Sequence, residues 1–382
     1  MRVLISAGEA SGEMYGAQLI QALLRRNSAF EFFGVGGDRM RAAGCQTVVD
    51  AKDLSVVGIT EILSHLPRIW GLFNQLIAEA EERKPELAIV IDSPAFNWRV
   101  AREMHKRGIP TVYYVAPQFW AWRQGRVRLL RKYVTKALVI FPFEEKFYRE
   151  RGVDTAFVGH PLVDVPPPKI SREAYATQNS LDLPRPWIVL MPGSRAKEVS
   201  MNLPPILESL PLLGSEYEFV LPVAPTLEPS LLESMIGSRP VRLVQESLPA
   251  LAHARAGIIA SGTATVEAAM MGLPFVMVYR VSRLSYWLGR SRVKVPHFAM
   301  VNLIAGEAIV PELVQSDFTP DNVFMELDKV VADGEARDRM VRGLAGVRVR
   351  LRGNIQGNMP AIDRAAEAIL EVIHRERVDR AG

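Results

Sequence analysis

Short apolar runs alternate with helical patterns along almost the whole chain. In the first half, runs without polar interruption predict strands at Arg2–Ser6, Phe30–Val35, Leu87–Asp92, Thr111–Val115, Ala137–Phe141 and Thr155–Val158. Helical periodicity between them predicts helices at Gly12–Arg26, Thr60–Arg83, Asn97–Lys106 and Glu144–Arg151. Because the strands are continuously apolar, this alternation indicates a parallel sheet with helices on both faces.

A second series of apolar runs follows at Trp187–Met191, Glu218–Pro222, Val241–Val244, Gly257–Ala260 and Pro274–Tyr279, with helical patterns from Asp321 onward. The proline-rich stretch between the two series is typical of a linker. We therefore expect an α/β protein with two Rossmann-like, doubly wound domains that face a shared cleft. The expected divisions are residues 1–163, a linker at 164–186, residues 187–350, and a helical segment at 351–382 that could pack back on the first domain.

Composition narrows the class of protein. The chain has 382 residues, 48% hydrophobic and 23% charged, which is typical of a soluble globular protein of two domains. Its one cysteine, Cys45, excludes a disulfide framework and favours a reducing cytoplasm. The sequence shows neither a signal peptide nor a run of about 18 apolar residues. The six histidines have no metal-binding spacing, so no bound metal is expected.

Charge is unevenly distributed although the net charge is only +4. The segment Met104–Phe143 contains eight Lys or Arg and no acidic residue, and Ala268–Gly306 also lacks acidic residues. Such segments favour an anionic partner (a nucleotide, a phospholipid or a nucleic acid) unless they are simply solvated basic surface. The chain has no recognition-helix or RNA-binding signature, which disfavours nucleic acid.

Two strand–turn–helix stretches of the second domain are candidates for binding an anion. Ser261, Gly262 and Thr263 follow one apolar strand and precede a helix that carries Glu267. Such a turn offers unpaired N–H groups and a positive helix end to an anion, and Glu267 could accept a hydrogen bond from a sugar hydroxyl. An ordinary capped turn explains the pattern equally well.

The other stretch ends in Ser194 and Arg195, where a guanidinium could meet a pyrophosphate at a helix start. Neither domain has Gly-x-Gly-x-x-Gly at its first turn, and the chain has no P-loop, which disfavours a classical dinucleotide oxidoreductase and a P-loop nucleotide site.

In the first domain, small residues and a carboxylate follow two strands. Gly8, Glu9 and Ser11 lie in the first turn, where a backbone could approach a ligand closely. Asp92 ends a buried strand, and partial burial there would raise its pKa and suit it to accept a proton. The alternative is a helix cap, which Pro94 and a helix start near Asn97 would disfavour.

Aromatic and basic residues also gather in this domain. The loop after one strand is predicted to form a wall of the substrate site, with the residues Gln118, Trp120, Trp122 and Arg123, although one tryptophan could instead pack in the core. His160 could line the cleft or only pack against its neighbours. The helix Thr60–Arg83 has one apolar face, consisting of Ile62, Leu63, Leu66, Ile69, Trp70 and Phe73. That face either covers the core or inserts into a membrane surface.

Taken together, these motifs resemble the lipid-A-disaccharide synthase family from Ser6 to about Gln315. The matching stretches are Gly8–Glu13, Ile91–Pro94, Pro117–Arg123, Gly159–Pro161, Leu190–Arg195, Ala260–Glu267, Tyr279–Arg280 and Asn302–Gly306. The resemblance implies an inverting, metal-independent glycosyltransferase of the GT-B type, without a cofactor, that lies in the cytoplasm on the inner face of the inner membrane. Its substrates would be UDP-2,3-diacylglucosamine and 2,3-diacylglucosamine 1-phosphate, its products a β-1,6-linked disaccharide 1-phosphate and UDP.

The resemblance also assigns roles to residues. Asp92 matches an essential carboxylate and Arg195 an essential arginine, while Ser261, Thr263, Glu267, Tyr279, Arg280 and Asn302 match positions on the UDP side. It places Ile62–Phe73 on the membrane and expects no nucleic acid; a homodimer stays open. Three positions depart from the family pattern, namely Glu13, Ala95 and Val301. Another GT-B enzyme, such as a UDP-sugar epimerase or a peptidoglycan-type transferase, is the main alternative.

Overall fold

The computed structural model describes residues 1–55, 62–282, 295–353 and 359–381. The chain forms two compact units. The first consists of Met1–Asp164 together with Arg352–Gly382, and the second of Val165–Leu351. None of the helices in these described ranges is long and apolar enough to cross a membrane.

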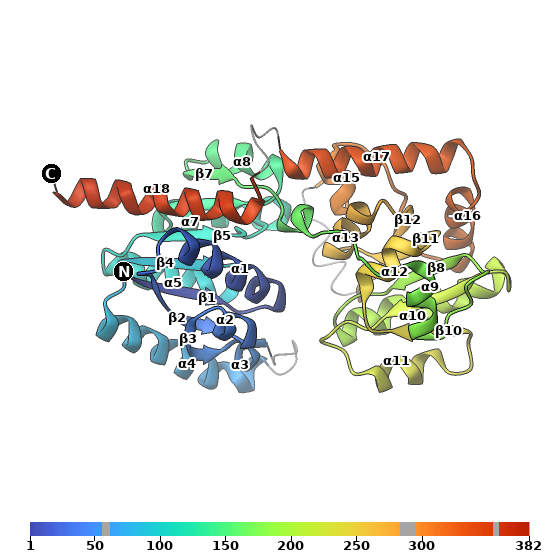
Figure 1. Cartoon of the computed structure of the whole chain (residues 1–382), viewed down its shortest axis with the longest axis horizontal. Helices are drawn as coiled ribbons and strands as arrows, with labels where there is room; N and C mark the ends of the chain where they lie inside the picture. The colour runs from blue at the N-terminus through green and yellow to red at the C-terminus, as the bar shows by residue number, and fades with distance from the viewer. Residues whose placement is uncertain (56–61, 283–294, 354–358, 382) are drawn as a thin grey trace. The chain divides into compact units, whose positions relative to one another are not determined.

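The first unit is built on a parallel sheet of seven strands in the order β3-β2-β1-β4-β5-β6-β7 (Figure 1). The strands are β1 (Arg2–Ala7), β2 (Glu31–Gly36), β3 (Cys45–Asp50), β4 (Leu87–Ile91), β5 (Thr111–Tyr114), β6 (Lys136–Val139) and β7 (Thr155–Phe157). Strand β1 pairs with β2 on one side and β4 on the other, so Leu4 faces both Phe33 and Ala88. The chain therefore reverses its direction of winding between β1 and β4.

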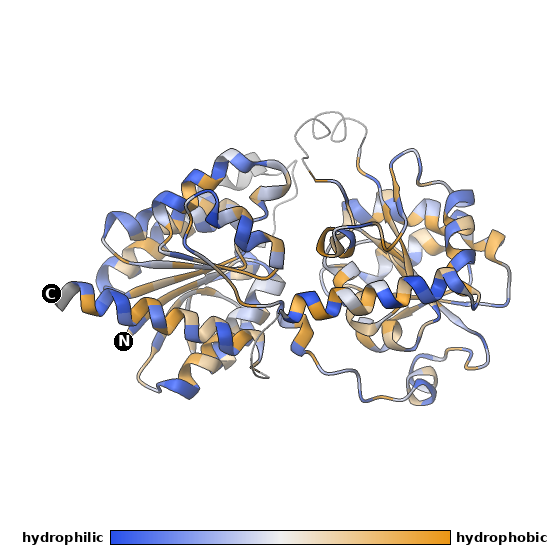
Figure 2. Cartoon of the chain, turned by 90° about the horizontal axis from the view of Figure 1, so that it is seen from above, coloured by the Kyte–Doolittle hydropathy of each residue, from blue (hydrophilic) through white to orange (hydrophobic). Residues whose placement is uncertain are grey.

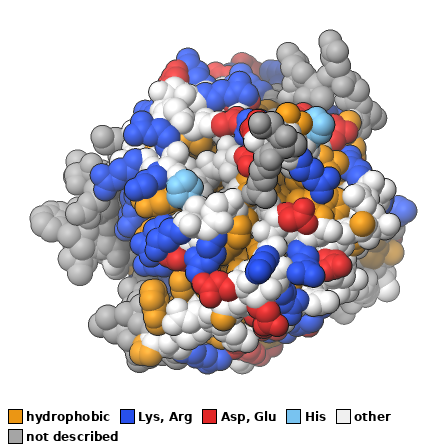
Figure 3. Space-filling view, turned by 90° about the vertical axis from the view of Figure 1, so that its left-hand side faces the viewer, with side chains coloured by type: hydrophobic (Ala, Val, Ile, Leu, Met, Phe, Trp, Pro, Cys, Tyr) orange, Lys and Arg blue, Asp and Glu red, His pale blue; other side chains and the backbone are white. Residues whose placement is uncertain are grey.

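Helices cover both faces of this sheet, because each has an apolar stripe that needs burial. They are α1 (Ala10–Arg26), α2 (Asp38–Ala42), α3 (Ala51–Ser55), α4 (Ile62–Arg83), α5 (Pro94–Lys106), α6 (Phe119–Trp122), α7 (Val127–Tyr133), α8 (Pro142–Arg149) and α18 (Ala361–Ala381), with 3₁₀ turns at Gln124–Arg126 and Pro161–Asp164. Figure 2 shows the hydrophobic strands between helices of mixed character. Basic and acidic side chains are interspersed on the face of the molecule that Figure 3 shows.

The second unit repeats the architecture with six parallel strands in the order β10-β9-β8-β11-β12-β13. They are β8 (Trp187–Met191), β9 (Glu218–Pro222), β10 (Val241–Val244), β11 (Ala256–Ala260), β12 (Phe275–Tyr279) and β13 (Glu312–Val314). The described helices are α9 (Arg172–Asn179), α10 (Ala196–Leu213), α11 (Pro229–Ile236), α12 (Ser247–His253), α13 (Thr263–Met271), α15 (Met300–Ala305), α16 (Pro320–Val331) and α17 (Glu335–Arg352). Here the direction of winding reverses between β8 and β11.

The structure corrects the prediction of a linker at 164–186. Residues from Val165 onward belong to the second unit, and α9 lies within the supposed linker. Tyr175 of α9 is buried, its ring contacts that of Trp187, and its hydroxyl donates to the carbonyl of Glu246 at 2.7 Å. The proline run hid this short helix, whose main anchor is a single aromatic side chain.

Two further differences concern element boundaries. Helix α5 begins at Pro94 rather than near Asn97, with Ser93 as its N-cap residue. Pro94 fits the first helical position because proline has no N–H to leave unpaired there. The predicted start of the long helix at Thr60 falls outside the described residues.

The C-terminal helix α18 packs on α1. Asp363 accepts from Arg26 at 2.7 Å and from Arg25 at 3.2 Å, and Arg364 donates to the carbonyl of Val158 at 2.7 Å. Gly159 leaves room for this arginine, since a Cβ there would lie 1.9 Å from its Nη2. The end of the chain thus completes the first unit.

Candidate active site

The point where winding reverses in the first unit brings two of the predicted turns together. Ligands of doubly wound sheets bind beyond the carboxyl ends of the strands at such a switch point. The turn after β1 contains Gly8, and the turn after β4 contains Ser93. The two turns touch, because a Cβ on Gly8 would lie 2.7 Å from the Ser93 hydroxyl oxygen. Glycine at this position therefore allows the first turn to approach Asp92.

The backbone of the Asp92 turn is strained. Asp92 and Ser93 have φ angles of 49° and 48°, in the left-handed region that residues with a side chain rarely adopt. Val115, which follows the neighbouring strand β5, has φ 54°. Strain of this kind costs on the order of 1–3 kcal/mol per residue and persists only where surrounding structure enforces it.

Three buried side chains hold the Asp92 turn in place, and we call them the clamp: Ser6, Asn97 and Tyr113. The Asn97 amide donates to the carbonyls of Ile91 and Asp92, both at 2.9 Å. It accepts from the Ser6 hydroxyl at 2.7 Å, and the Tyr113 hydroxyl donates to the Asp92 carbonyl at 2.7 Å. The clamp fixes the backbone from which the half-exposed Asp92 carboxylate projects.

Glu9 belongs to the same neighbourhood. Burial raises the pKa of Tyr113 well above its usual value, and the charges of Asp92, Tyr148 and Glu9 raise it further. The Tyr113 hydroxyl is therefore near both predicted carboxylates. Ser11 is half-buried in the first turn of α1. Glu13, which departs from the family pattern, accepts from the backbone N–H of Arg39 at 2.9 Å and so ties α1 to α2.

The aromatic loop after β5 is divided between core and surface. Trp120 is buried and donates its indole N–H to Glu144 at 2.8 Å, so its prediction as part of a substrate wall is wrong. Gln118 is exposed, Trp122 is 47% exposed, and the Arg123 guanidinium lies 3.8 Å from the Trp122 ring centroid. Trp120 thus anchors the loop, whereas three of its residues lie at the surface, namely Gln118, Trp122 and Arg123.

His160 is also a packing residue rather than a residue of the cleft. Its side chain is fully buried, its ring contacts that of Phe141, and burial lowers its pKa to about 3. Its Nδ1 accepts from the backbone N–H of Leu162 at 3.2 Å. A neutral, enclosed imidazole of this kind cannot contact a ligand without local opening, which corrects the alternative that it lines the cleft.

In the second unit, the predicted phosphate turns both lie at the switch point, between β8 and β11. After β8, Ser194 donates its N–H to Glu198 at 3.2 Å, and Arg195 donates to the same carboxylate at 3.1 Å. Gly193 has φ 130°, and a Cβ there would lie 2.7 Å from the Glu198 side chain. An internal carboxylate therefore occupies the helix start where the sequence predicts an anion.

The turn after β11 is open. Gly262 has φ 143°, a Cβ on it would meet no atom within 4 Å, and both Gly262 and Thr263 are exposed. Ser261 donates its hydroxyl to the carbonyl of Phe298 at 2.8 Å. One turn along α13, burial raises the pKa of the half-buried Glu267, although a hydrogen bond from Ser247 opposes the effect.

The remaining predicted donor residues differ in their surroundings. Burial raises the pKa of Tyr279, as does the charge of Glu198, while Arg195 lowers it, so Tyr279 lies near the β8 turn. The Arg280 guanidinium donates to the carbonyls of Gln315 and Phe318.

Asn302 is fully buried with its amide satisfied inside the unit. It accepts from the N–H groups of Ile309 and Val310 and donates to the carboxylate of Glu312 at 2.8 Å. The prediction that Asn302 contacts the donor is therefore wrong. Its side chain supports the loop before β13. Val301, beside it, is buried as well.

The apolar helix α4 is only partly on the surface. Trp70 is 55% exposed and Ile69 is half-buried, whereas Phe73 is 5% exposed and packs its ring edge-on against Phe96. Phe73 therefore belongs to the core, and its prediction as a membrane contact is wrong. The side chains of Ile62, Leu63 and Leu66 lie outside the described part of the structure.

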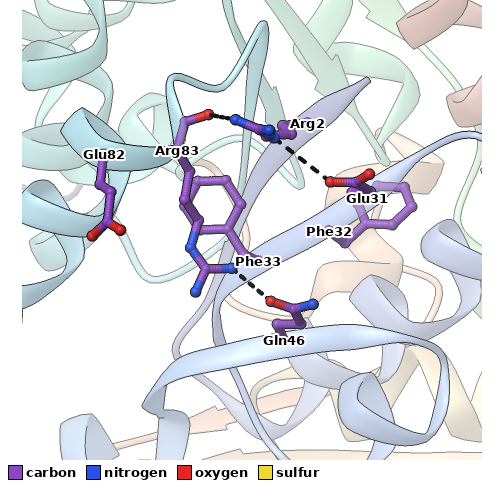
Figure 4. Close-up of a pocket in the computed structure, with 7 residues that line it drawn as sticks. All are labelled: Arg2, Glu31, Phe32, Phe33, Gln46, Glu82 and Arg83. Carbon is purple, nitrogen blue, oxygen red and sulfur yellow. Dashed lines mark hydrogen bonds and ion pairs between the residues drawn. The ribbon is translucent and has the colours of Figure 1, made fainter.

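A recess of about 420 Å³ lies at the amino ends of β1 and β2, at the end of the strands opposite the Asp92 turn (Figure 4). Several of its lining residues contact one another: Arg83 donates to Gln46 at 2.6 Å and lies 5.0 Å from the Phe33 ring centroid, and Arg2 donates to the carbonyl of Arg83 at 2.9 Å. This self-contained network offers little to a ligand. Across the described ranges, no group of three His, Cys, Asp or Glu side chains could hold a metal ion.

Sequence reasoning missed the residues that hold the site in shape. Asn97 has one visible signal, since it is a polar residue on the buried face of α5, five positions after Asp92. Glu198 lies in the first turn of α10, three residues after Arg195, where an acidic side chain stabilises the helix start.

Comparison with known proteins gives a consistent result. A family model described as lipid-A-disaccharide synthetase matches residues 3–351. The lipid-A-disaccharide synthase of Koribacter versatilis is 49% identical over 98% of this chain and 100% of its own. That of Acidobacterium capsulatum is 46% identical over 97% of this chain and 96% of its own.

Among solved structures, the glycotransferase of kitacinnamycin superposes with a TM-score of 0.64 at 16% identity, over 97% of this chain and 98% of its own. That similarity confirms the predicted GT-B fold of two parallel-sheet α/β domains. The family match over most of the chain then establishes what kind of enzyme carries this fold. The chain belongs to the lipid-A-disaccharide synthase family, glycosyltransferases that form the lipid A disaccharide.

Proposed function

We propose that this enzyme transfers 2,3-diacylglucosamine from UDP-2,3-diacylglucosamine to the 6-hydroxyl of 2,3-diacylglucosamine 1-phosphate, with inversion at the anomeric carbon. One observation carries the assignment of the chemistry to the first unit. In a chain of this family, a half-exposed carboxylate projects from a strained turn that three buried side chains clamp at the switch point. Strain retained in this way is characteristic of functional sites.

Asp92 acts as the general base. It takes the proton of the acceptor hydroxyl while the hydroxyl oxygen forms its bond to the anomeric carbon. The bond from that carbon to the β-phosphate oxygen breaks, and UDP leaves with the electron pair. General base catalysis of this kind contributes about 10²–10⁴-fold to the rate. Ala95, three residues after Asp92, offers no second carboxylate, so the proton transfer rests on Asp92.

The second unit holds the donor. The exposed turn Gly262–Thr263 presents the start of α13 to the pyrophosphate. Arg195 stabilises the charge on the leaving UDP, and the carboxylate of Glu198 marks the position where an anion meets this arginine and the N–H of Ser194. Glu267, Tyr279 and Arg280 lie on adjoining elements and complete the proposed donor side.

Product analysis tests the reaction. The purified enzyme is expected to form the disaccharide 1-phosphate and UDP from the two acylated substrates, and to retain activity with a chelator present.

Asp92→Asn should lower kcat by about 10²–10⁴-fold with an unchanged melting temperature, and Arg195→Ala should also lower kcat. The exposed Asp379→Asn on α18 is the matched control. Wild-type turnover by Asp92→Asn would remove Asp92 from the chemistry.

The donor also separates this reaction from other GT-B reactions. We expect turnover with diacylated UDP-glucosamine and little with its deacylated form. Conversion of UDP-N-acetylglucosamine to its 2-epimer, without disaccharide formation, would instead identify an epimerase. Equal use of acylated and deacylated donors would contradict the proposed lipid substrate.

Contact with the inner face of the inner membrane is the second part of the proposal, with the enzyme in the cytoplasm. The exposed Trp70 on α4 supports it, because an indole at a surface suits the headgroup region of a bilayer. Trp70→Ser should weaken co-sedimentation with vesicles of phosphatidylglycerol. Met325→Ser on α16 is matched to it, since Met325 is 51% exposed. Equal loss of binding in both variants would refute a specific role of α4.

A homodimer remains a prediction that light scattering can test.

A further inference from the structure

Two arginines of α5 are held against one tryptophan. The guanidinium carbon of Arg99 lies 4.8 Å from the ring centroid of Trp98, and that of Arg102 lies 5.5 Å from it. Arg99 and Arg102 are three residues apart, so they share one face of the helix. Trp98 thereby keeps two like charges together that would otherwise repel each other.

A third arginine adds to this charge. Helix α5 packs against α7, and Arg126 ends the 3₁₀ turn just before α7. Burial lowers the pKa of Arg99, and the charges of Arg102 and Arg126 lower it further. We call Arg99, Arg102 and Arg126 the arginine cluster.

Few acidic side chains neutralise the positive charge of the arginine cluster. Arg102 has Glu103 at 3.4 Å, but Glu103 also binds Lys106 at 2.8 Å and Arg107 at 3.0 Å. The Nε–H of Arg102 is buried and has no hydrogen-bond partner in the described part of the chain. The sequence from Met104 to Phe143 supplies no acidic residue at all. An anion with several acceptor oxygens would relieve the repulsion among the exposed guanidinium ends.

The position of the cluster relates it to the proposed chemistry. Helix α5 begins directly after the clamped Asp92 turn, and a rise of 1.5 Å per residue places Arg99 roughly 8 Å along its axis. That separation is on the scale of one sugar ring. A phosphorylated sugar could therefore present its hydroxyl at Asp92 and its phosphate toward the cluster.

We propose that Arg99, Arg102 and Arg126 form a phosphate-binding site, which holds the 1-phosphate of the acceptor. The acceptor assignment rests on the proposed function; the phosphate chemistry does not. The planar guanidinium groups provide paired donors that match phosphate oxygens, and Trp98 pre-orients two of them. A phospholipid headgroup offers the same chemistry, and the experiment separates the two sources.

The test uses Arg99→Gln/Arg102→Gln in the full chain, which keeps a polar side chain at each position but removes two charges. The control Lys146→Gln/Arg339→Gln removes two charges from exposed positions on α8 and α17. The KM for 2,3-diacylglucosamine 1-phosphate should rise about tenfold to a hundredfold in the cluster variant. The KM for the donor, the use of acceptor lacking the phosphate, and the melting temperature should stay unchanged.

Two further measurements keep the outcome unambiguous. Calorimetry with glucosamine 1-phosphate and with glucosamine reports phosphate recognition without turnover, so an inactive enzyme would sink the proposed function and leave the cluster testable. Loss of binding to phosphatidylglycerol vesicles, with phosphate preference retained in the kinetics, would assign the site to a lipid headgroup. Wild-type behaviour of the cluster variant in kinetics, calorimetry and vesicle binding would overturn the proposal.

Discussion

The peptide after β4 is held by side chains that come from three separate parts of the sequence. Ser6 belongs to β1, Tyr113 to β5 and Asn97 to α5, and all three are buried. Asn97 is central, because it both accepts from Ser6 and donates to the Asp92 carbonyl. Its removal takes one hydrogen bond from the Ser6 hydroxyl and one from each of the carbonyls of Ile91 and Asp92, and the Asp92 carbonyl keeps only its bond from Tyr113.

Asn97→Ala is therefore expected to affect both stability and catalysis. The free energy of unfolding should fall by about 1–3 kcal/mol, the usual cost of unsatisfied buried polar groups. The kcat should fall by about tenfold or more, because the Asp92 turn loses its fixed geometry. The KM for the donor should stay unchanged, because the second unit is not altered. Urea denaturation and steady-state kinetics measure the two effects.

Tyr113→Phe provides a graded comparison, since it removes only one hydrogen bond to the Asp92 carbonyl. It should have a smaller effect on kcat than Asn97→Ala. If Asn97→Ala lost stability but kept its kcat, the clamp would be purely structural.

At the residue scale, the sequence predicts positions but not partners. Asp92, Gly8, Arg195 and Gly262 could be singled out because each follows an apolar strand, where doubly wound sheets bind ligands. The partners of the site could not, because the bond from Ser6 to Asn97 spans 91 residues. Asn302 was assigned to the donor side from the family resemblance, although its amide is satisfied by its own loop.

At the scale of elements, Glu144 connects α8 to the aromatic loop. It lies in the first turn of α8, accepts from the N–H of Phe141 at 3.0 Å, and also accepts from the indole of Trp120. Burial raises its pKa from 4.5 to about 7, although these hydrogen bonds act in the opposite direction. One carboxyl thus couples a helix start to the loop that displays Trp122.

This raised pKa predicts a particular dependence of stability on pH. Because the folded-state pKa of Glu144 exceeds the unfolded one, its contribution is present below about pH 4.5 and is lost as pH rises through about 7. The shift corresponds to roughly 3 kcal/mol. In Glu144→Gln the decline of unfolding free energy over this range should be shallower than in the wild type. Denaturation across a pH series checks this; Glu233→Gln, exposed on α11, should retain the wild-type slope.

Strands that are fully buried were the easiest to predict from the sequence. Strand β4 is buried at every position and was predicted almost to the residue, whereas β3 is half-exposed and has only one paired edge. Strand β13, three residues long, likewise lies at a sheet edge. Edge strands need less apolar surface, so their sequences carry a weaker pattern. Both were missed, whereas the edge strands β7 and β10 carry enough apolar residues to have been predicted.

At the scale of the whole molecule, Asp164 links the place where the chain leaves the first unit to the helix that returns to it. Its carboxylate accepts from the backbone N–H of Ala361, the first residue of α18. Asp164→Ala should lower the stability of the first unit by about 1 kcal/mol, the usual cost of a lost helix cap. Hydrogen exchange should accelerate in α18 and α1 but not in α10 or α13. Uniform acceleration in both units would contradict this local role.

The discontinuity of the first unit has a consequence for biosynthesis. Residues Met1–Asp164 are synthesised before the second unit, whereas their partner α18 is synthesised only after it. At usual rates of translation, synthesis of Val165–Leu351 takes roughly 10–40 s, during which the face of α1 that α18 covers stays uncovered. The second unit, which is continuous in sequence, can finish folding in the nascent chain while the first still awaits the synthesis of α18.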